Sequence, residues 1–407
     1  MTDIGSGTKK RVLFVDDEQG ILDGLRNRLR RKRDQWDMSF ALGGKDALEQ
    51  LSQQPCDVIV TDMRMPGMDG ATLLMQVQSL YPDIVRIVLS GHAEFEAALR
   101  AIPVAHQFLA KPCDPGILEN VVDRACQLQR LVNDATVRAI VGKVSGLPVM
   151  PQLYSKLRRM LTDEKCSMQD VANVIKQDAG MCAKILQLVN SAFFRLSRQL
   201  SRIDDAIGYL GLEAVHRVVL AGELFSDESP YKAAGGLLTS LRTHSIATAT
   251  IASQLLSNKK QQEDAFIAAL LHDIGKLLLA VYIPDHLKLA TEHAKSTGVS
   301  FHAGELATAG VSHAEVGAYL LGIWGLPYFI VEAVANHHEP TRVEEPEFGV
   351  LGAVYVGDVL AHELIDGTSE PLDPAYAERV GLALRWPEWK KRFGPLVADL
   401  GARLVSG

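Results

Sequence analysis

The sequence predicts two folds in series: an α/β domain built on a doubly wound, parallel, five-stranded sheet, followed by an all-helical domain. Between Lys10 and about Arg130, short apolar segments alternate with helical patterns, which is the order of elements in a doubly wound sheet. From Leu147 onward, apolar residues recur at intervals of three and four, and strand-like alternation disappears. At 407 residues the chain also exceeds the usual size of one hydrophobic core, so more than one domain is expected.

The composition is that of an ordinary globular protein, with 47% hydrophobic and 22% charged residues and a net charge of −7. The acidic balance argues against a protein that binds nucleic acid over its whole surface, because phosphate backbones attract an excess of Lys and Arg.

We find no apolar run of the roughly 20 residues that span a membrane, and the segment MTDIGSGTKK has no signal-peptide core. The five cysteines form no Cys-X-X-Cys pair, which is typical of reduced thiols. We therefore expect a cytoplasmic protein with no membrane partner.

Five segments are expected to form the parallel sheet, and most of them end in polar residues. They are RVLFVDD (Arg11–Asp17), DVIVTDM (Asp57–Met63), RIVLSG (Arg86–Gly91), QFLAKP (Gln107–Pro112) and a shorter one near MSFAL (Met38–Leu42). Ligands of such sheets bind at the carboxyl ends of the strands, so we expect five side chains to converge there. These are Asp16, Asp17, Asp62, Ser90 and Lys111. Because neighbouring carboxylates repel one another, a hard divalent cation with oxygen ligands would stabilise this group.

Four motifs follow one another along these strands: VDDE, TDMRMPGMDG, LSGH and FLAKP. Over roughly the first 125 residues they closely resemble the receiver domain of two-component response regulators. The resemblance implies that a sensor histidine kinase phosphorylates Asp62. It also implies that Ser90 and Phe108 are switch residues and that Lys111 contacts the phosphoryl group. The alternative is an inert flavodoxin-like domain with chance acids at its strand ends.

The same resemblance implies a magnesium site beside the phosphoacceptor. Asp17 and Asp62 would bind Mg²⁺ directly. Asp16 would act through a water molecule, and Arg64 would contribute its backbone carbonyl. In such a site the carboxylate attacks phosphorus in line, while Mg²⁺ and the Lys111 ammonium neutralise the phosphoryl oxygens.

A long helix is predicted to connect the two domains, from Pro115 to about Lys143. Apolar residues along it are spaced 4, 3, 4, 3 and 4 apart, as in the seam of a coiled coil. They are Val121, Ala125, Leu128, Val132, Ala135 and Ala139. The pattern predicts a homodimer through this linker helix. Since half of the seam is alanine, packing of the helix back onto the receiver remains the alternative.

Seven residues of the helical region form a candidate metal site. They occur in the motifs RTHSIA, LLHDIGK, SHAEVG, ANHHEP and YVGDVLA, and are His244, His272, Asp273, His313, His337, His338 and Asp358. Sets of imidazole and carboxylate groups suit Zn²⁺, Mn²⁺ or Fe. Lys276 lies one helical turn after His272 and is a candidate phosphate contact. A lone histidine on an apolar helix is more often a core residue, but histidines on four separate segments favour a shared site.

The order of these residues resembles the HD superfamily of metal-dependent phosphohydrolases, and HDIGK with the paired histidines resembles its c-di-GMP phosphodiesterase branch, the HD-GYP domains. That branch continues with a DGxGYP loop, whereas here the paired histidines are followed by EPTRVEEPEFGV. The block from Leu147 to Pro340, which contains LPVMPQL, LVNSAFF, DDAIGYLG and GIWGLP, closely resembles the HDOD domain. The HDOD resemblance implies a signalling or scaffolding output without an established hydrolase activity.

We therefore expect a receiver at 8–127, a linker helix at 128–145, an HDOD output domain at 146–345 and a C-terminal helical extension at 346–407. The leading hypothesis is a response regulator whose output binds an unknown downstream signalling protein. The alternative is a phosphorylation-regulated metal phosphohydrolase that acts on c-di-GMP or another nucleotide. The acidic loop after the histidines opposes this enzyme, because it repels a phosphodiester. A DNA-binding regulator ranks last, since no helix-turn-helix is recognisable and the basic run Arg26–Asp34 is interpreted as a solvated helix face.

Overall fold

The structure is a computed structural model of the chain, and it divides into two compact units. The first comprises Met1–Ser145, Gln187–Arg198 and Ile323–Gly325, and the second comprises Gly146–Leu186, Gln199–Gly322 and Leu326–Gly407. The structure describes all residues except 1–8, 92–99, 132–134, 145–146, 148–150, 163–165, 192–195, 197–198, 225–228, 345–346, 366, 368–371, 383–384 and 406–407.

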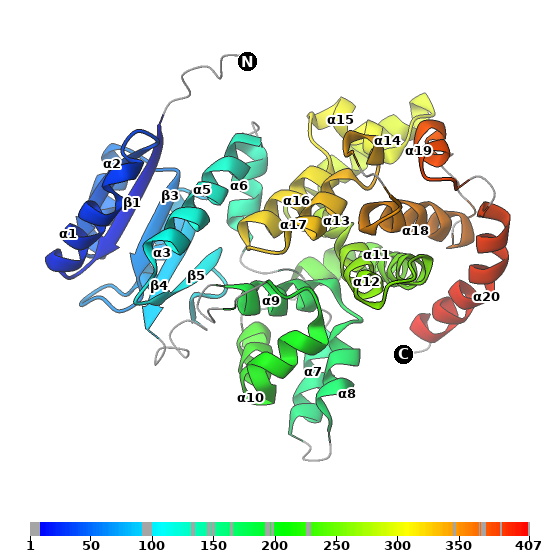
Figure 1. Cartoon of the computed structure of the whole chain (residues 1–407), viewed down its shortest axis with the longest axis horizontal. Coiled ribbons are helices and arrows are strands. Elements are labelled where there is room, and N and C mark those ends of the chain that lie inside the picture. Colours follow the sequence, from blue (N-terminus) through cyan, green and yellow to red (C-terminus); the bar gives the residue numbers. More distant parts are fainter. Residues whose placement is uncertain are drawn as a thin grey trace. The chain divides into compact units, whose positions relative to one another are not determined.

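The first unit is built around a parallel five-stranded sheet with the strand order β2-β1-β3-β4-β5 (Figure 1). The strands are β1 (Lys10–Asp16), β2 (Trp36–Leu42), β3 (Val58–Asp62), β4 (Val85–Gly91) and β5 (Gln107–Lys111). The described helices of this unit are α1 (Gln19–Arg28), η1 (Leu29–Lys32), α2 (Gly44–Gln53), α3 (Gly70–Leu80), α5 (Pro115–Leu131) and α6 (Ala135–Lys143). The prediction of a doubly wound parallel sheet is confirmed, and all five predicted strands are present.

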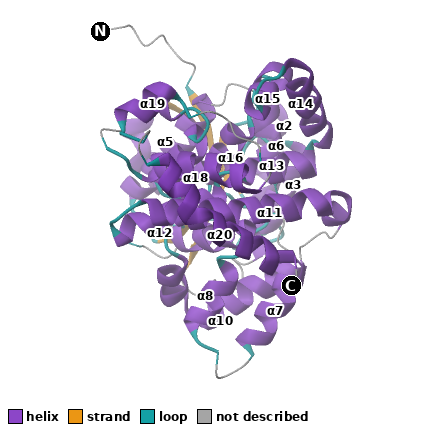
Figure 2. Ribbon diagram, turned by 90° about the vertical axis from the view of Figure 1, so that its right-hand side faces the viewer, coloured by secondary structure: helices purple, strands orange, loops and turns teal. Residues whose placement is uncertain are grey.

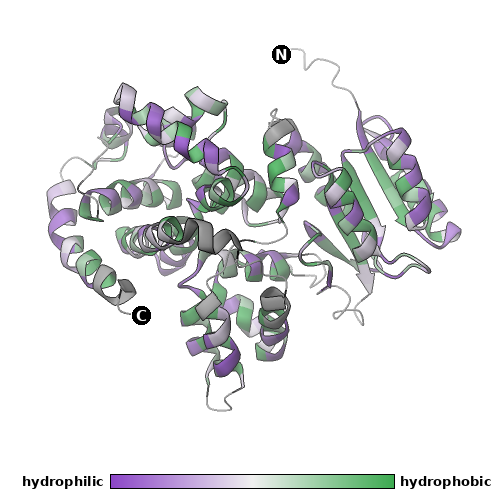
Figure 3. Ribbon diagram, turned by 180° about the vertical axis from the view of Figure 1, so that it is seen from behind, coloured by the Kyte–Doolittle hydropathy of each residue, from purple (hydrophilic) through white to green (hydrophobic). Residues whose placement is uncertain are grey.

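Burial explains why polar side chains are found mainly at the ends of these strands. The central strand β3 is buried along its whole length, and Val12, Phe14 and Ile87 on the neighbouring strands are inaccessible to solvent. Helices cover both faces of a parallel sheet, so both faces of its strands are apolar. Figure 3 shows several strands of the sheet largely in green, the hydrophobic colour. Ionisable groups are tolerated where the strands end, which is where Asp16, Asp62 and Lys111 lie.

Ion pairs hold α5 against the receiver. Arg31 of η1 donates two hydrogen bonds to Glu119, Nε to Oε1 at 3.0 Å and Nη2 to Oε2 at 2.9 Å. The Lys32 ammonium lies 2.6 Å from the Asp123 carboxylate. Part of the basic run, interpreted from the sequence as a solvated helix face, therefore binds the helix that follows the sheet.

Helix α6 docks on the receiver at Gly142. The carbonyl of Gly142 accepts hydrogen bonds from Arg86 Nη2 at 2.8 Å and from Gln78 Nε2 at 3.3 Å. A Cβ atom at this position would lie 1.5 Å from the backbone oxygen of Pro82, so glycine is required for the approach. The described part of the connector thus packs back onto the receiver.

The predicted coiled-coil seam is only partly available on the surface of this chain. Ala125 is buried, and the other members with a described environment are half-buried: Val121, Leu128 and Ala139. Val132 lies outside the described residues. A homodimer through the linker helix remains a prediction.

The second unit is helical throughout its described residues (Figure 2). Its helices are α7 (Pro151–Leu161), α8 (Met168–Ile175), α9 (Ala179–Asn190), α10 (Ile203–Leu224), α11 (Ser229–Leu255), α12 (Lys259–Leu271), α13 (Ile274–Tyr282), α14 (Pro284–Thr297), α15 (Phe301–Ala309), α16 (His313–Ile323), α17 (Tyr328–Asn336), η3 (Pro340–Arg342), α18 (Val350–Ile365), α19 (Pro374–Arg379) and α20 (Trp386–Val405). The last residues of α9 and α16 are assigned to the first unit. The all-helical prediction is confirmed.

The core of the second unit forms around α18, which is buried from Leu351 to Ala361 and packs against α11, α12 and α17. The chain after residue 346 belongs to the same core, because Tyr376, Trp389 and Phe393 join a hydrophobic cluster with residues of α18. The C-terminal tryptophan Trp389 therefore serves packing.

One described stretch, Lys259–Tyr282, is long and apolar enough to cross a membrane, with a mean hydropathy of 1.7. The sequence search for uninterrupted apolar runs missed it, because His272, Asp273 and Lys276 interrupt it. In the structure 72% of this apolar window is buried inside the protein. Its two helices, α12 and α13, pack against α11, as the core helices of a globular domain do.

Candidate functional site

The carboxyl ends of β1, β3 and β5 bring three charged side chains into direct contact. The Lys111 ammonium lies 2.8 Å from Asp16 Oδ2 and also forms an ion pair with Asp62 Oδ1. Asp16 and Asp62 are 1% and 6% exposed, so one ammonium balances two carboxylates that have little contact with water. These are three of the five side chains expected to converge at this edge of the sheet.

The other predicted residues of this site lie on the strands of the sheet or shortly after them. Ser90 is buried at the end of β4, Phe108 is buried within β5, and Asp17 is exposed just after β1. The backbone N–H of Arg64 donates to Asp62 Oδ2 at 3.0 Å, which fixes the orientation of the carboxylate.

Electrostatics favour a further cation at this position. Burial, reinforced by the negative charge of Asp16, raises the pKa of the Asp62 carboxyl above its ordinary value, against the opposing effect of Lys111. Burial alone would lower the pKa of Lys111, but its hydrogen bonds to Asp16 and Asp62 outweigh burial and raise it. Two acids against one ammonium leave a net negative charge with oxygen donors, which fits Mg²⁺.

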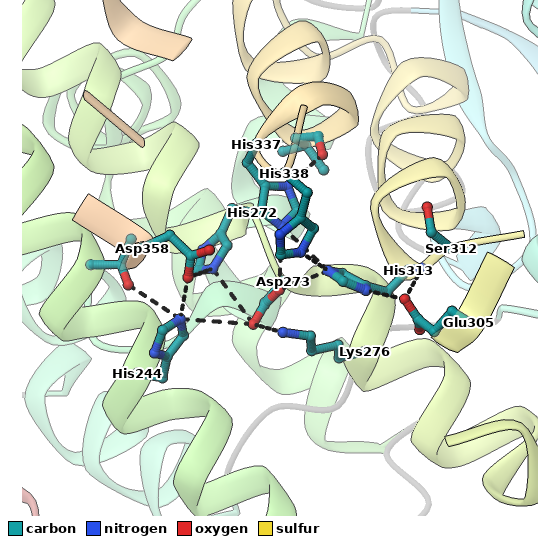
Figure 4. A network of polar contacts seen from close by, with 12 residues as sticks. His244, His272, Asp273, Lys276, Glu305, Ser312, His313, His337, His338 and Asp358 are labelled. Atoms are coloured by element: carbon teal, nitrogen blue, oxygen red, sulfur yellow. Dashed lines mark hydrogen bonds and ion pairs between the residues drawn. The ribbon is translucent and has the colours of Figure 1, made fainter. Parts of the chain in front are cut away.

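The seven candidate metal ligands of the helical unit lie in one polar cluster (Figure 4). Five places in the fold contribute them: α11 carries His244, the α12–α13 junction His272 and Asp273, α16 His313, the end of α17 His337 and His338, and α18 Asp358. Asp273 lies between the two ends of the cluster, with His244 on one side and His313 on the other (Figure 4). Lys276 donates to Asp273 Oδ2 at 2.8 Å, and its contact with a phosphate remains a prediction.

At one end of the cluster two histidines share a carboxylate. Asp358 Oδ1 lies 2.8 Å from His244 Nε2 and 3.3 Å from His272 Nε2. Asp273 Oδ2 completes the group, 3.5 Å from His272 Nε2 and 4.0 Å from His244 Nε2. Two imidazoles and two carboxylates converging in this way form a donor set for a borderline divalent cation.

The other end of the cluster contains three histidines. Asp273 Oδ1 lies 3.2 Å from His313 Nε2 and 3.7 Å from His337 Nε2. His313 Nε2 is also 3.1 Å from His338 Nε2. Asp273 directs one oxygen to each end, so it would be a ligand of an ion held at either end.

Contacts made by the Nδ1 atoms of three imidazoles orient their Nε2 atoms into the cluster. His272 and His337 each donate Nδ1–H to the backbone carbonyl three residues earlier, at 2.6 and 2.8 Å. His313 Nδ1 lies 2.5 Å from Glu305 Oε2. Histidines that bind metals make contacts of this type, which fix the tautomer and leave the Nε2 lone pair for the ion.

The electrostatic environment keeps most of these groups in the form that binds a metal. Burial, together with neighbouring histidines, holds the pKa of His337 and His338 well below the ordinary value. Burial opposes ionisation of Asp358, but hydrogen bonds from His244 and His272 hold its pKa well below the usual range. Neutral imidazoles and ionised carboxylates are the ligand states that metal binding requires.

Most of the cluster is closed to solvent, although His338 at one end is half-buried. The exposed fractions are 0% for His272, His313 and His337, 2% for Asp273, 3% for Asp358 and 6% for His244. A hydrolytic metal needs an open position for water and a path for the scissile phosphate. This arrangement suits retention of an ion or of a polar network better than turnover of a bulky phosphodiester.

Glycine at position 275 brings the two halves of the cluster together. A Cβ atom on Gly275 would lie 1.9 Å from the backbone oxygen of His313, so α13 and α16 touch through their backbones. On α16, Gly317 faces the same crossing, where a Cβ would lie 3.1 Å from Gly275 N. The glycine in HDIGK therefore places Asp273 next to His313.

Sequence reasoning missed several residues of this cluster. Glu305, fully buried on α15, holds His313. His362 lies one turn after Asp358, with Nε2 3.6 Å from Asp358 Oδ1, and the ring of His302 stacks on that of His338 at 4.7 Å. The only sign of Glu305 in the sequence is a carboxylate within the largely apolar stretch FHAGELATAG. A helical pattern alone does not show which face of the helix lies against the metal cluster.

The segment after the paired histidines is acidic, as the sequence shows. It forms the short helix η3, in which Glu339 pairs with Arg342 at 2.7 Å. Glu344 and Glu347 are exposed, and residues 345–346 lie outside the described part.

Comparison with known protein families accounts for both units. The response regulator receiver domain matches residues 12–123, and the HDOD domain matches residues 147–340. The chain therefore contains a receiver domain and an HDOD domain. This confirms the resemblance inferred from the motifs.

The chain is also similar to individual proteins. It is 28% identical over 220 residues to the C4-dicarboxylate transport transcriptional regulatory protein DctD of Rhizobium meliloti, covering 53% of this chain and 46% of that protein. It is 25% identical over 238 residues to an uncharacterized protein of Treponema pallidum, covering 57% and 45%. These matches span less than half the length of the curated relatives.

Solved structures with a similar fold include the MmoQ response regulator of Methylococcus capsulatus, with 22% identity and a TM-score of 0.47, covering 60% of this chain and 98% of that chain. Another is the signal receiver domain of an HD domain-containing protein from Pseudomonas fluorescens, with 28% identity and a TM-score of 0.29, covering 30% and 99%.

Proposed function

We propose that this protein is a cytoplasmic response regulator in which phosphorylation of Asp62 by a sensor histidine kinase controls a helical HDOD output. The observation that carries the proposal is the Asp62 carboxylate at the end of β3, held by the Arg64 N–H and paired with Lys111. In this geometry the Asp62 carboxylate can act as the oxygen nucleophile, and the Lys111 ammonium can neutralise the negative charge of the phosphoryl group.

Magnesium would be held by Asp17 and Asp62 directly, by Asp16 through water and by the backbone carbonyl of Arg64. When bound, Mg²⁺ neutralises the phosphoryl oxygens as the charge on them develops. Lys111 would exchange part of its pairing with the carboxylates for a contact with the phosphoryl group. Ser90 and Phe108 would then move as the switch pair.

The connector provides the route from the receiver to the output. The strand β4 carries Ser90 at one end and Arg86 near the other, and Arg86 donates to the carbonyl of Gly142 on α6. A shift of β4 on phosphorylation would therefore act on the docking of α6. We propose a change in the population of docked and released connector, or in dimer contacts, rather than new chemistry.

Phosphoryl uptake from a small acyl-phosphate donor tests the proposal. The full-length protein should be labelled only with Mg²⁺ present, and Asp62→Asn should abolish labelling. Lys111→Ala should still take up the phosphoryl group without producing the change in the connector. Equal labelling of Asp62→Asn and the parent would show that Asp62 is not the acceptor.

The helical unit is proposed to act as a signalling module that holds metal, with Zn²⁺, Mn²⁺ or Fe bound by the histidine and aspartate cluster. A downstream signalling protein, rather than DNA, would be its partner. The cluster retains a full donor set, which favours the alternative of an HD-type phosphohydrolase. Its closure to solvent and the acidic segment after His338 oppose that alternative.

Incubation of the purified full-length protein with c-di-GMP and each metal distinguishes these outputs. We expect no cleavage at an enzymatic rate, and His272→Ala should reduce stability more than any turnover. Rapid metal-dependent cleavage that is lost in Asp273→Ala would establish the enzyme instead.

A further inference from the structure

His302 lies beside the paired histidines but is absent from the family order that points to the cluster. It sits on α15, and its ring stacks on that of His338 at 4.7 Å with an interplanar angle of 27°. Neither ring nitrogen has a hydrogen-bond partner in the described structure, although both are shielded from solvent. Ring nitrogens that are shielded from solvent and lack a partner are unfavourable, so this position is suited to a ligand.

The neighbouring histidines present their nitrogen atoms to the same point. Fully buried Glu305 accepts from His313 Nδ1, so the Nε2 lone pair of His313 faces outward. His313 Nε2 lies 3.1 Å from His338 Nε2 and 3.2 Å from Asp273 Oδ1. One nitrogen atom from each of His302, His313 and His338 lies within 4.8 Å of the others.

This end of the cluster lies nearer to the protein surface than the other end. His302 and His338 are half-buried, although the His302 nitrogens themselves are shielded, whereas the ligands around Asp358 are almost inaccessible. Glu339 Oε2 lies 3.7 Å from His302 Nε2, close enough to hold a water molecule on a fourth coordination position.

We propose that His302, His313 and His338 form a three-imidazole site for Zn²⁺ or a similarly borderline divalent ion, with one open position towards Glu339. Three imidazole nitrogen donors favour such ions over Mg²⁺, which prefers oxygen ligands. The site deepens and rests on the proposed metal-holding function of the helical unit. Of the two ends of the cluster this one lies nearer to the surface, so its ion is the one expected to exchange with free zinc.

Zinc stoichiometry and affinity of the full-length protein, measured by titration calorimetry after removal of metals with a chelator, test the site. His302→Ala and the size-conserving His302→Gln should each lose one bound Zn²⁺ or bind it at least about 10-fold more weakly. Both should keep the zinc held by the buried end. Co²⁺ substitution gives a second readout, because the visible absorption of a tetrahedral site should fall in both variants.

His293→Ala removes a histidine of α14 outside the cluster and is the matched control, with binding expected to equal that of the parent. If the parent binds no zinc at all, the metal-holding function fails, and this site fails with it. If the parent binds zinc and both His302 variants bind the same amount with the same affinity, only the assignment of His302 is wrong.

Discussion

At the scale of single residues, the receiver contains a buried cation whose partners are mainly neutral groups. The Arg86 side chain is inaccessible to solvent and donates to the backbone oxygens of Val104 at 2.5 Å and Gly142 at 2.8 Å. The His106 ring lies against it: Nδ1 accepts from Arg86 N at 3.0 Å, and Nε2 lies 2.9 Å from Arg86 Nη2. A protonated His106 would have no lone pair for Arg86 N and would place a second positive charge beside the guanidinium.

This arrangement predicts a pH-dependent stability of the receiver. Burial, with a smaller contribution from Arg86, holds the pKa of His106 well below 6.5 in the folded state. Because the unfolded chain takes up this proton below about 6.5 and the folded chain does not, stability is fully present above that pH. It should fall by up to about 1.4 kcal/mol for each pH unit below it.

Denaturant unfolding of the protein and of His106→Gln at several pH values between 5 and 8 measures this effect. The variant should be less stable at pH 8 and should lose less stability on acidification than the parent. Parallel pH profiles of the two proteins would show that His106 does not cause the acid sensitivity.

At the scale of elements, the crossing of α13 and α16 determines the geometry of the metal cluster. We predict that Gly275→Ala destabilises the helical unit by about 2–4 kcal/mol, because its Cβ would overlap the His313 backbone and force the helices apart. The same shift should abolish zinc binding, since Asp273 and His313 would no longer meet.

Gly208→Ala provides the control for this substitution. Gly208 lies on α10, where a Cβ would meet nothing within 4 Å. Alanine there should be neutral or stabilise the helix by up to about 1 kcal/mol. Thermal unfolding and zinc titration of the two variants check the prediction, which is wrong if Gly275→Ala unfolds and binds zinc like the parent.

The sequence predicts elements and ligands well where periodicity and motif order carry the information. The strands could be identified from the sequence because their apolar runs end in Asp16, Asp62, Ser90 and Lys111. The alternation of strands with helices predicts that the sheet is parallel. The metal cluster could be approached because its members occur in HD order. Glu305 and His302 could not be found in this way, since they reach the cluster through the packing of α15, which no local pattern encodes.

At the scale of the whole molecule, the chain joins a receiver to a helical unit through a connector whose helix α6 is docked on the receiver by a close backbone contact and by buried side chains such as Val137 and Val141. The docking of α6 depends on Gly142, with its carbonyl bound by Arg86 and its Cα against Pro82. A Cβ at this position would lie 1.5 Å from the Pro82 oxygen, so a small displacement of α6 would break the close packing on which this contact depends. The receiver's state can therefore bias whether the connector is docked.

We predict that a stable phosphoryl mimic, beryllofluoride with Mg²⁺, changes the exposure of the connector. At full occupancy of Asp62, limited proteolysis near Lys143 or the hydrodynamic size of the full-length protein should differ between the two states. Gly142→Ala, which cannot dock α6, should be cleaved rapidly with or without the mimic. Gly24→Ala, on α1 with nothing within 4 Å of the added Cβ, should behave as the parent. Identical cleavage and size of the parent in both states would remove the connector from the signalling route, because a docked α6 that ignores the state of Asp62 carries no information to the helical unit.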